Sequence, residues 1–137
     1  MLQVKSRSDT NRGVRFMATI CLYQDTRHES PLLWMREIFG IGYISHRKDS
    51  ITELRVNGFA SVRRILILLQ PYIRFKQVQV TALLNACEIL GGRRVGDLNE
   101  VQLKELVDLV FLIRENNYKS RQTLTKETLL LRLGLTP

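Results

Sequence analysis

Ten polar side chains among the first 55 residues have types that can bind phosphates and read the edges of bases. Arginine and lysine pair with phosphates, and arginine can also hold a guanine through two hydrogen bonds at once. The ten residues are Gln3, Lys5, Arg7, Arg15, Thr19, Tyr23, Ser45, Arg47, Glu53 and Arg55. They predict a surface that contacts nucleic acid. The alternative is an ordinary solvated face, because any half-exposed sheet shows polar alternation.

Most of these side chains alternate with apolar ones, which indicates β-strands. Residues 2–5 and 14–23 have a period of two and flank a loop, 6–13, that is rich in Ser, Asp, Asn and Gly. Residues 43–47 and 51–56 form a second pair of this kind. The two hairpins predict a four-stranded antiparallel sheet with one apolar face. That face carries Leu2, Val4, Val14, Phe16, Ala18, Ile20, Ile44, Leu54 and Val56.

Helical patterns lie between the hairpins and in most of the sequence after residue 56. Residues 30–39 have Ser30 as a candidate N-cap and Pro31 in the first turn, and they end at Gly40. An apolar sheet face needs helices to cover it. We therefore expect an α+β fold in a single domain, 1–137, with two hairpins flanking a helix in 1–56 and a mainly helical part in 57–137. The later helices are expected at residues 60–69, 73–90, 100–114 and 125–133.

The charge of the chain is strongly basic and unevenly distributed. Its 137 residues include 21 Lys and Arg against 13 Asp and Glu, for a net charge of +8. Residues 57–96 hold six bases and one acid, whereas residues 97–115 are mainly acidic. A polyanionic partner, nucleic acid foremost, explains such an excess, because positive charge otherwise destabilises a compact protein by self-repulsion. The pattern predicts one face on the polyanion and another facing solvent.

Several classes of protein are disfavoured by the same sequence. Cys21 and Cys87 are far apart and lack metal-ligand spacing, so we expect neither a zinc site nor a disulfide framework. The longest apolar run, residues 65–69, is too short to cross a membrane. We expect a soluble protein, cytoplasmic or organellar, with reduced thiols.

Three stretches together resemble a known family. Residues 39–44 end a helix with a Gly-x-Gly turn into a strand, and residues 69–79 join two helices through Pro71 into a Lys-Gln-x-Gln segment. Residues 117–128 form a polar, basic tail. In this order and at these separations, over nearly the whole chain, they resemble the single-motif, homodimeric LAGLIDADG homing endonucleases encoded in ribosomal RNA-gene introns. The Lys-Gln-x-Gln segment is the most specific of the three.

The resemblance implies a fold and an activity. It implies a four-stranded antiparallel saddle sheet, with helices packed on one face, that lies in the major groove of double-stranded DNA. It also implies a homodimer formed through paired motif helices, and phosphodiester hydrolysis driven by divalent metal, Mg²⁺ by expectation, held by an acid at the end of that helix.

Individual roles carry over by position. Gln24 matches a water-ordering glutamine, and Lys76 matches an active-site lysine. His28 stands where the family usually has arginine or lysine, and Arg27 beside it could serve after a one-residue shift. Each residue has an alternative without function: Gln24 as a polar residue at a strand end, Lys76 as a surface lysine, and His28 as a capping or solvated histidine. The tail residues matching DNA-backbone contacts are Lys119, Arg121 and Lys126.

The motif helix of the family has no counterpart before the first expected strand, so the sequence offers no metal ligand of the family type. We expect a reading frame truncated at its 5′ end, with the first helix absent; a decaying or split gene, or a helix supplied by another chain, are the alternatives. Cleavage is expected to be impaired, because metal-assisted hydrolysis needs a carboxylate to hold the metal. A non-cleaving binder of DNA or intron RNA, such as a repressor or maturase-like protein, is the alternative function. A basic protein-interaction domain without nucleic acid ranks last.

Overall fold

Four antiparallel strands form one sheet in the computed structural model, which describes residues 1–8, 12–117 and 124–137. The order across the sheet is β1-β2-β4-β3, so each predicted hairpin is present and the two join through β2 and β4. This confirms the expected α+β fold and its four-stranded sheet. The strands are β1 (Leu2–Ser6), β2 (Val14–Asp25), β3 (Tyr43–His46) and β4 (Ile51–Asn57).

The long strand β2 has different neighbours along its two halves. Residues Val14 to Ala18 pair with β1, and residues Thr19 to Asp25 pair with β4 on the opposite edge. Because β4 begins its pairing only at Thr19, the first half of β2 has one edge without a strand neighbour among the described residues. A short 3-10 turn, η3 (Val95–Asp97), lies beside β2 instead.

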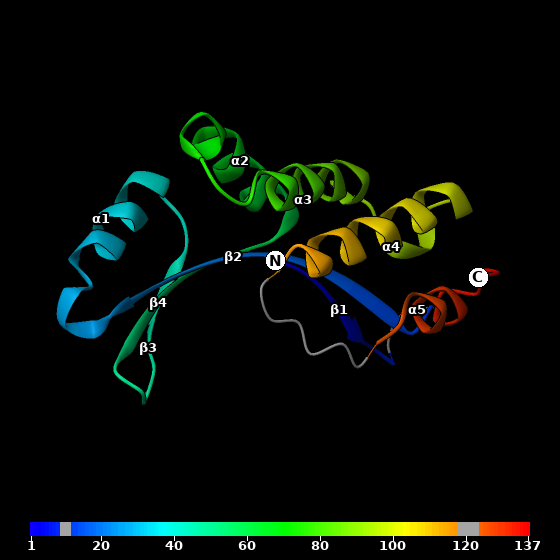
Figure 1. Cartoon of the computed structure of the whole chain (residues 1–137), viewed down its shortest axis with the longest axis horizontal. Helices are drawn as coiled ribbons and strands as arrows, with labels where there is room; N and C mark the ends of the chain where they lie inside the picture. The colour runs from blue at the N-terminus through cyan, green and yellow to red at the C-terminus, as the bar shows by residue number, and fades with distance from the viewer. Residues whose placement is uncertain (9–11, 118–123) are drawn as a thin grey trace.

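The helices cover one side of the sheet. Figure 1 shows α2, α3 and α4 above the strands, with α1 beside the β3–β4 end and α5 near the C-terminus. The helices are α1 (Ser30–Phe39), α2 (Phe59–Leu69), α3 (Gln77–Leu90), α4 (Glu100–Glu115) and α5 (Lys126–Arg132). Two further 3-10 turns are η1 (Thr26–His28) and η2 (Gln70–Tyr72). No helix within these described residues is long and apolar enough to cross a membrane.

The start of α3 and the N-cap of α1 differ from the sequence prediction. α3 begins at Gln77 rather than at residue 73, because Ile73 is extended and Lys76 has a left-handed backbone with φ of 59°. Neither conformation continues a right-handed helix. The N-cap of α1 is Glu29, and Ser30 is already helical, so the prediction of Ser30 as the cap was wrong.

The apolar face of the sheet packs into the core as predicted. Leu2, Phe16 and Leu54 are buried, whereas Val4 and Ile20 are partly exposed at its margin. They belong to one cluster with buried residues of the helices, including Val62, Ile65, Leu106 and Leu129. Full burial of one such side chain stabilises the fold by roughly 1.5–3 kcal/mol. The opposite sheet face is therefore the side free to carry polar groups.

Candidate nucleic-acid interface

The strand register places most of the predicted polar residues on the face away from the helices. Directly opposed residues share a face, and alternate residues along a strand return to it. Lys5 lies opposite Arg15, and Gln3 lies opposite Met17 on the β1–β2 half. This half of the face therefore combines two cations with an amide.

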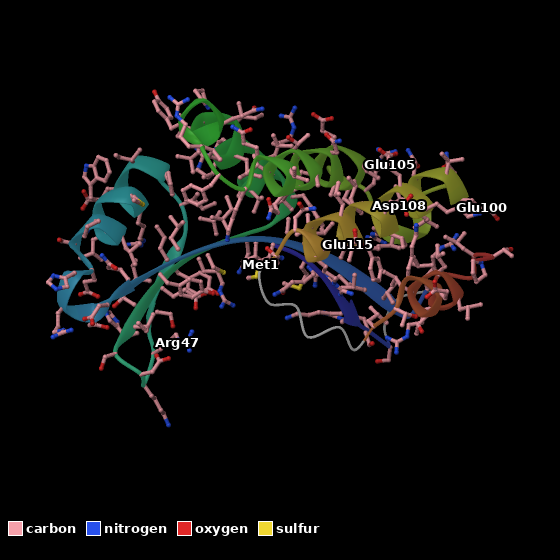
Figure 2. The ribbon with its side chains drawn as sticks, viewed as in Figure 1. Met1, Arg47, Glu100, Glu105, Asp108 and Glu115 are labelled. Atoms are coloured by element: carbon pink, nitrogen blue, oxygen red, sulfur yellow. The ribbon has the colours of Figure 1, made fainter. Side chains whose placement is uncertain are left out.

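The other half of this polar face consists of two rows that cross β2, β4 and β3. In one row Tyr23 lies opposite Glu53, which lies opposite Ser45. In the next row Cys21, Arg55 and Tyr43 are aligned in the same way. Arg47 follows the end of β3, and Figure 2 shows its side chain beneath the sheet, far from the acidic residues labelled along α4. Arg63 and Arg64 of the basic stretch 57–96 lie on α2, in the helical layer with α4, so the division of charge between two faces stays a prediction.

Arg55 is held in place by Glu53. The guanidinium Nε donates to Glu53 Oε1, and Glu53 is only 5% exposed. The Arg55 hydrogen bond, more than any other contact, lowers the pKa of Glu53, and the same bond raises the pKa of Arg55. Because the carboxylate of Glu53 is buried and already hydrogen-bonded, its role is to hold the Arg55 side chain in place. The sequence analysis had placed Glu53 among the residues expected to contact nucleic acid directly.

Cys21 lies inside the same network. Burial raises the pKa of its thiol, which shares hydrogen bonds with Tyr23 and Glu53. The thiol thus joins the hydroxyl of Tyr23 to the Glu53–Arg55 pair. The sequence had treated Cys21 only as a reduced cysteine.

Thr19 is less accessible than the sequence suggested. Its side chain is buried, and its hydroxyl donates to Asn57 Oδ1 across the strands at 3.0 Å. Arg7 lies just beyond the end of β1, where its backbone N–H donates to Gly13 O at 2.9 Å. Thr19 therefore makes a cross-strand contact, and Arg7 extends the basic edge of the hairpin.

Gln24, His28 and Lys76 are all exposed, but they stand on different elements. Gln24 is near the end of β2 and pairs in register with Thr52, on the opposite sheet face from Tyr23. His28 ends η1, and Lys76 precedes α3. In the part of the chain that the structure describes, no hydrogen bond or ion pair joins the three side chains.

Two neighbours bear on these assignments. Arg27 is bound to Asp25 through Nε at 3.0 Å and through its terminal nitrogen at 2.9 Å, which lowers the pKa of Asp25 to about 2. The guanidinium of Arg27, which could take the role of His28 after a one-residue shift, is therefore already paired with Asp25. Lys76 lies close enough to the first strand to lower the pKa of the Met1 amine, although burial is the larger cause.

A polar cluster that sequence reasoning missed lies beside Gln24. Thr52 is fully buried, and its hydroxyl lies 2.7 Å from Glu29 Oε2 and 3.0 Å from Thr26 Oγ1. His46 Nε2 lies 2.7 Å from the same Glu29 oxygen. These bonds, that of Thr52 foremost, lower the pKa of Glu29. The available signal was the polar residue at an inward position, Thr52, next to apolar Leu54 and Val56.

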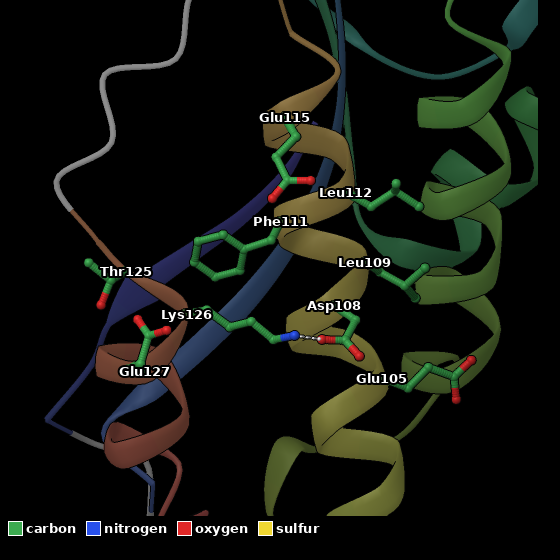
Figure 3. A pocket seen from close by; sticks show the side chains of 9 residues that line it. All are labelled: Glu105, Asp108, Leu109, Phe111, Leu112, Glu115, Thr125, Lys126 and Glu127. Atoms are coloured by element: carbon green, nitrogen blue, oxygen red, sulfur yellow. Dashed lines mark ion pairs between the residues drawn. The ribbon is translucent and has the colours of Figure 1, made fainter. Parts of the chain in front are cut away.

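Of the three C-terminal residues predicted to contact the DNA backbone, the structure describes one. Lys119 and Arg121 lie outside the described residues. Lys126 begins α5, and its Nζ lies 2.6 Å from Asp108 Oδ1 in a hollow that Glu105, Glu115 and Glu127 also line (Figure 3). A DNA phosphate would have to displace Asp108 from Lys126, so the contact of Lys126 with the DNA backbone stays a prediction.

Comparison with known proteins gives this geometry a family context. No family model matches the sequence. Over 92 residues the chain is 29% identical to the DNA endonuclease I-CvuI of Chlorella vulgaris. The match covers 67% of this chain and 57% of that protein, so it spans little more than half of the relative's length.

Solved structures match over almost the whole chain. A crystal structure of I-CvuI in complex with DNA has a TM-score of 0.85 at 24% identity, over 99% of this chain and 86% of that one. The archaeal intron-encoded homing endonuclease I-Vdi141I, complexed with DNA, has a TM-score of 0.81 at 19% identity, over 97% and 84%. The LAGLIDADG homing endonuclease I-SmaMI, bound to cleaved DNA, has a TM-score of 0.77 at 18% identity.

This chain has the LAGLIDADG homing endonuclease fold. The match to I-SmaMI covers 100% of this chain and 45% of I-SmaMI, so this chain corresponds to about half of that longer protein. The match to most of the I-CvuI chain supports the single-motif type that the sequence resembled.

The residues of this LAGLIDADG fold do not supply a metal site in the described part of the chain. No group of three or more His, Cys, Asp and Glu residues within it has a geometry that fits a metal ion. I-CvuI was crystallised with Mg in one complex and with Ca in another.

Proposed function

We propose that this chain is a subunit of a LAGLIDADG-type homing endonuclease and that its polar sheet face lies in the major groove of duplex DNA. The observation that carries this proposal is the strand register, which collects Lys5, Arg15, Arg55 and their polar neighbours on the face without helices. A β-sheet ribbon fits a major groove of about 12 Å. The net charge of +8 and the DNA complexes of the structural relatives support the same partner.

The catalytic roles follow from the same proposal. Lys76 would place an ammonium near the scissile phosphate and stabilise the negative charge that develops there. The Gln24 amide would orient the attacking water, and His28 would supply a second donor. Hydrolysis of the family type would need a divalent metal such as Mg²⁺ to supply Lewis acidity, with ligands from outside the described residues. Two copies of the chain would be needed to cover a pseudo-palindromic target.

A non-cleaving binder is the second candidate, and one observation favours it. The described residues contain no cluster of carboxylates or imidazoles that fits a metal. A repressor or a maturase-like binder of intron RNA needs the basic polar face but not the metal. Competition between duplex DNA and structured RNA would separate these two forms of binder.

Selection from a random duplex library tests both candidates. The purified chain should enrich a long target, and cleavage of that target with Mg²⁺ should then be assayed. Enrichment with cleavage supports the endonuclease, and enrichment without cleavage supports the binder. If no duplex is enriched and RNA competes fully, the major-groove proposal is refuted.

A further inference from the structure

A second basic surface lies at the edge of β2 that has no strand neighbour. A hollow of about 670 Å³ opens there, between the first half of β2 and the loop after α3. Arg12 and Arg15 line it from the hairpin, and Arg93 and Arg94 line it from the loop. Arg7 also reaches its wall. Neither the strand pattern nor the family resemblance had assigned a role to Arg12, Arg93 or Arg94.

The loop that carries two of these arginines is held by its own hydrogen bonds. Gly92 has φ of +74°, which turns the chain sharply after α3. The carboxylate of Asp97 then accepts the backbone N–H of Arg94 at 3.0 Å, and Asp97 N–H donates to Arg94 O at 3.0 Å. Because both ends of the turn are fixed, Arg93 and Arg94 are presented from an ordered loop.

Basic side chains outnumber acidic ones among the described residues that line the hollow. Among the described residues that line it, Asp97 alone is acidic, and its carboxylate is engaged by the backbone of Arg94. Arg15, Arg93 and Arg94 form no ion pair with another described residue. Like charges gathered in one hollow repel each other unless an anion occupies it. Arginine forks match the oxygens of a phosphate through paired hydrogen bonds.

Arg15 connects the hollow to the polar sheet face. It lies opposite Lys5 on that face and also lines the hollow, so the two basic surfaces are continuous. When a sheet occupies a major groove, the phosphate strands run along its edges. We propose that this hollow binds backbone phosphates of duplex DNA flanking the segment under the sheet, an inference that rests on the DNA-binding function proposed above.

The test compares two double variants that remove the same charge. Arg93→Ala with Arg94→Ala empties the loop side of the hollow. Arg63→Ala with Lys104→Ala is the matched control, because these exposed residues lie on α2 and α4 in the helical layer. Circular dichroism establishes that both variants are folded. Duplex affinity is then measured against salt for the selected target, both trimmed and extended by about one helical turn (about 10 bp) at each end.

The expected result is specific to the long duplex. Each lost phosphate contact makes the slope of log K against log[salt] less steep by about 0.9, so R93A/R94A should make it less steep by about 2 for each copy of the chain that binds. Affinity should fall to the same extent for target and unrelated sequences, since phosphates carry no sequence information. The control variant should keep the wild-type slope, and the trimmed duplex should show a smaller difference.

Other outcomes overturn the inference in distinguishable ways. If the wild-type chain binds duplex DNA and R93A/R94A keeps its slope, the hollow is not a backbone site although the proposed function stands. If inorganic phosphate binds the wild-type chain and not the variant, with duplex binding unchanged, the hollow serves a free anion instead. If the wild-type chain does not bind duplex DNA, the proposed function and this inference fail together.

Discussion

In the proposed DNA interface, Arg55 would contact a base and Glu53 would position Arg55. Glu53 is buried against the Nε side of the guanidinium, and Arg55 remains more than a third exposed. The bond to Glu53 uses Nε, and no hydrogen bond joins the terminal nitrogens of Arg55 to another described residue. A guanidinium fixed in this manner needs less ordering when it binds a base. Glu53 is accordingly a positioning residue.

Removing Glu53 should relax base selection at one position of the target. In Glu53→Ala the arginine loses its fixed orientation, and we expect the guanine preference there to fall about tenfold, within the 1–3 kcal/mol of a bidentate pair. Glu53→Gln should retain part of it. Target selection with each variant is the measurement. Arg55→Ala should affect the same position, and adding E53A to it should change little; independent effects would contradict the assignment.

Glu29 should make the stability of the chain depend on acidic pH. Its pKa is lowered from 4.5 in the folded protein, chiefly by the Thr52 hydrogen bond and then by that of His46. A lowered pKa stabilises the fold above pH 4.5, and this contribution is lost as pH falls through the folded value. Thermal unfolding of Glu29→Gln should therefore be less pH-dependent than wild type between pH 5 and 3. Exposed Glu37 on α1, the helix that follows Glu29, provides the control, E37Q, which should retain the wild-type dependence.

The hydroxyl of Thr52 should stabilise the fold through the same cluster. Thr52→Val keeps the shape of the side chain but leaves Glu29 and Thr26 without this partner. A loss of about 1 kcal/mol in unfolding free energy is expected, typical of one hydrogen bond. Urea unfolding at pH 7 measures it. A variant as stable as wild type would show that the bond contributes nothing net.

At the scale of elements, the Gly-x-Gly turn between α1 and β3 depends on its second glycine. Gly42 has φ of +109°, and a Cβ there would lie 2.9 Å from Leu54 Cδ1 and 3.2 Å from Arg55 O. Gly42→Ala combines backbone strain with a clash in the sheet, and we expect it to destabilise the chain by about 3 kcal/mol or more. Gly40→Ala is the control, because its Cβ meets open space. Equal losses in the two variants would contradict this account of the turn.

The elements themselves were largely readable from the sequence. Period-two alternation identified both hairpins and the polar face, and the apolar periodicity identified α2, α4 and α5 to within about two residues. The start of α3 was missed because the left-handed conformation of Lys76 has no sequence signal in a non-glycine residue. The Glu53–Arg55 pair and the arginine hollow were missed for another reason. Glu53 and Arg55 are alternate residues of β4, but the burial of Glu53 between Tyr23 and Ser45 appears only when the neighbouring strands are in place. The hollow depends on the position of η3 beside β2.

At the scale of the whole molecule, the account depends on two separated surfaces. The polar sheet face and the arginine hollow are basic, and α4 carries acidic residues on the helical side (Figure 2). This separation should orient the chain on a polyanion before any base is contacted. The fold, the net charge and the relatives bound to DNA all agree with such a role.

The most direct test is duplex DNA binding by this chain over a range of salt concentrations, followed by fluorescence anisotropy. If about six lysines and arginines contact phosphates, log K should fall with log[salt] at a slope near −5. A slope of that size, with tighter binding to a selected target than to random duplex, is the result that the account predicts. A flat salt response, or equal affinity for all sequences, would contradict the claim that the polar sheet face reads DNA.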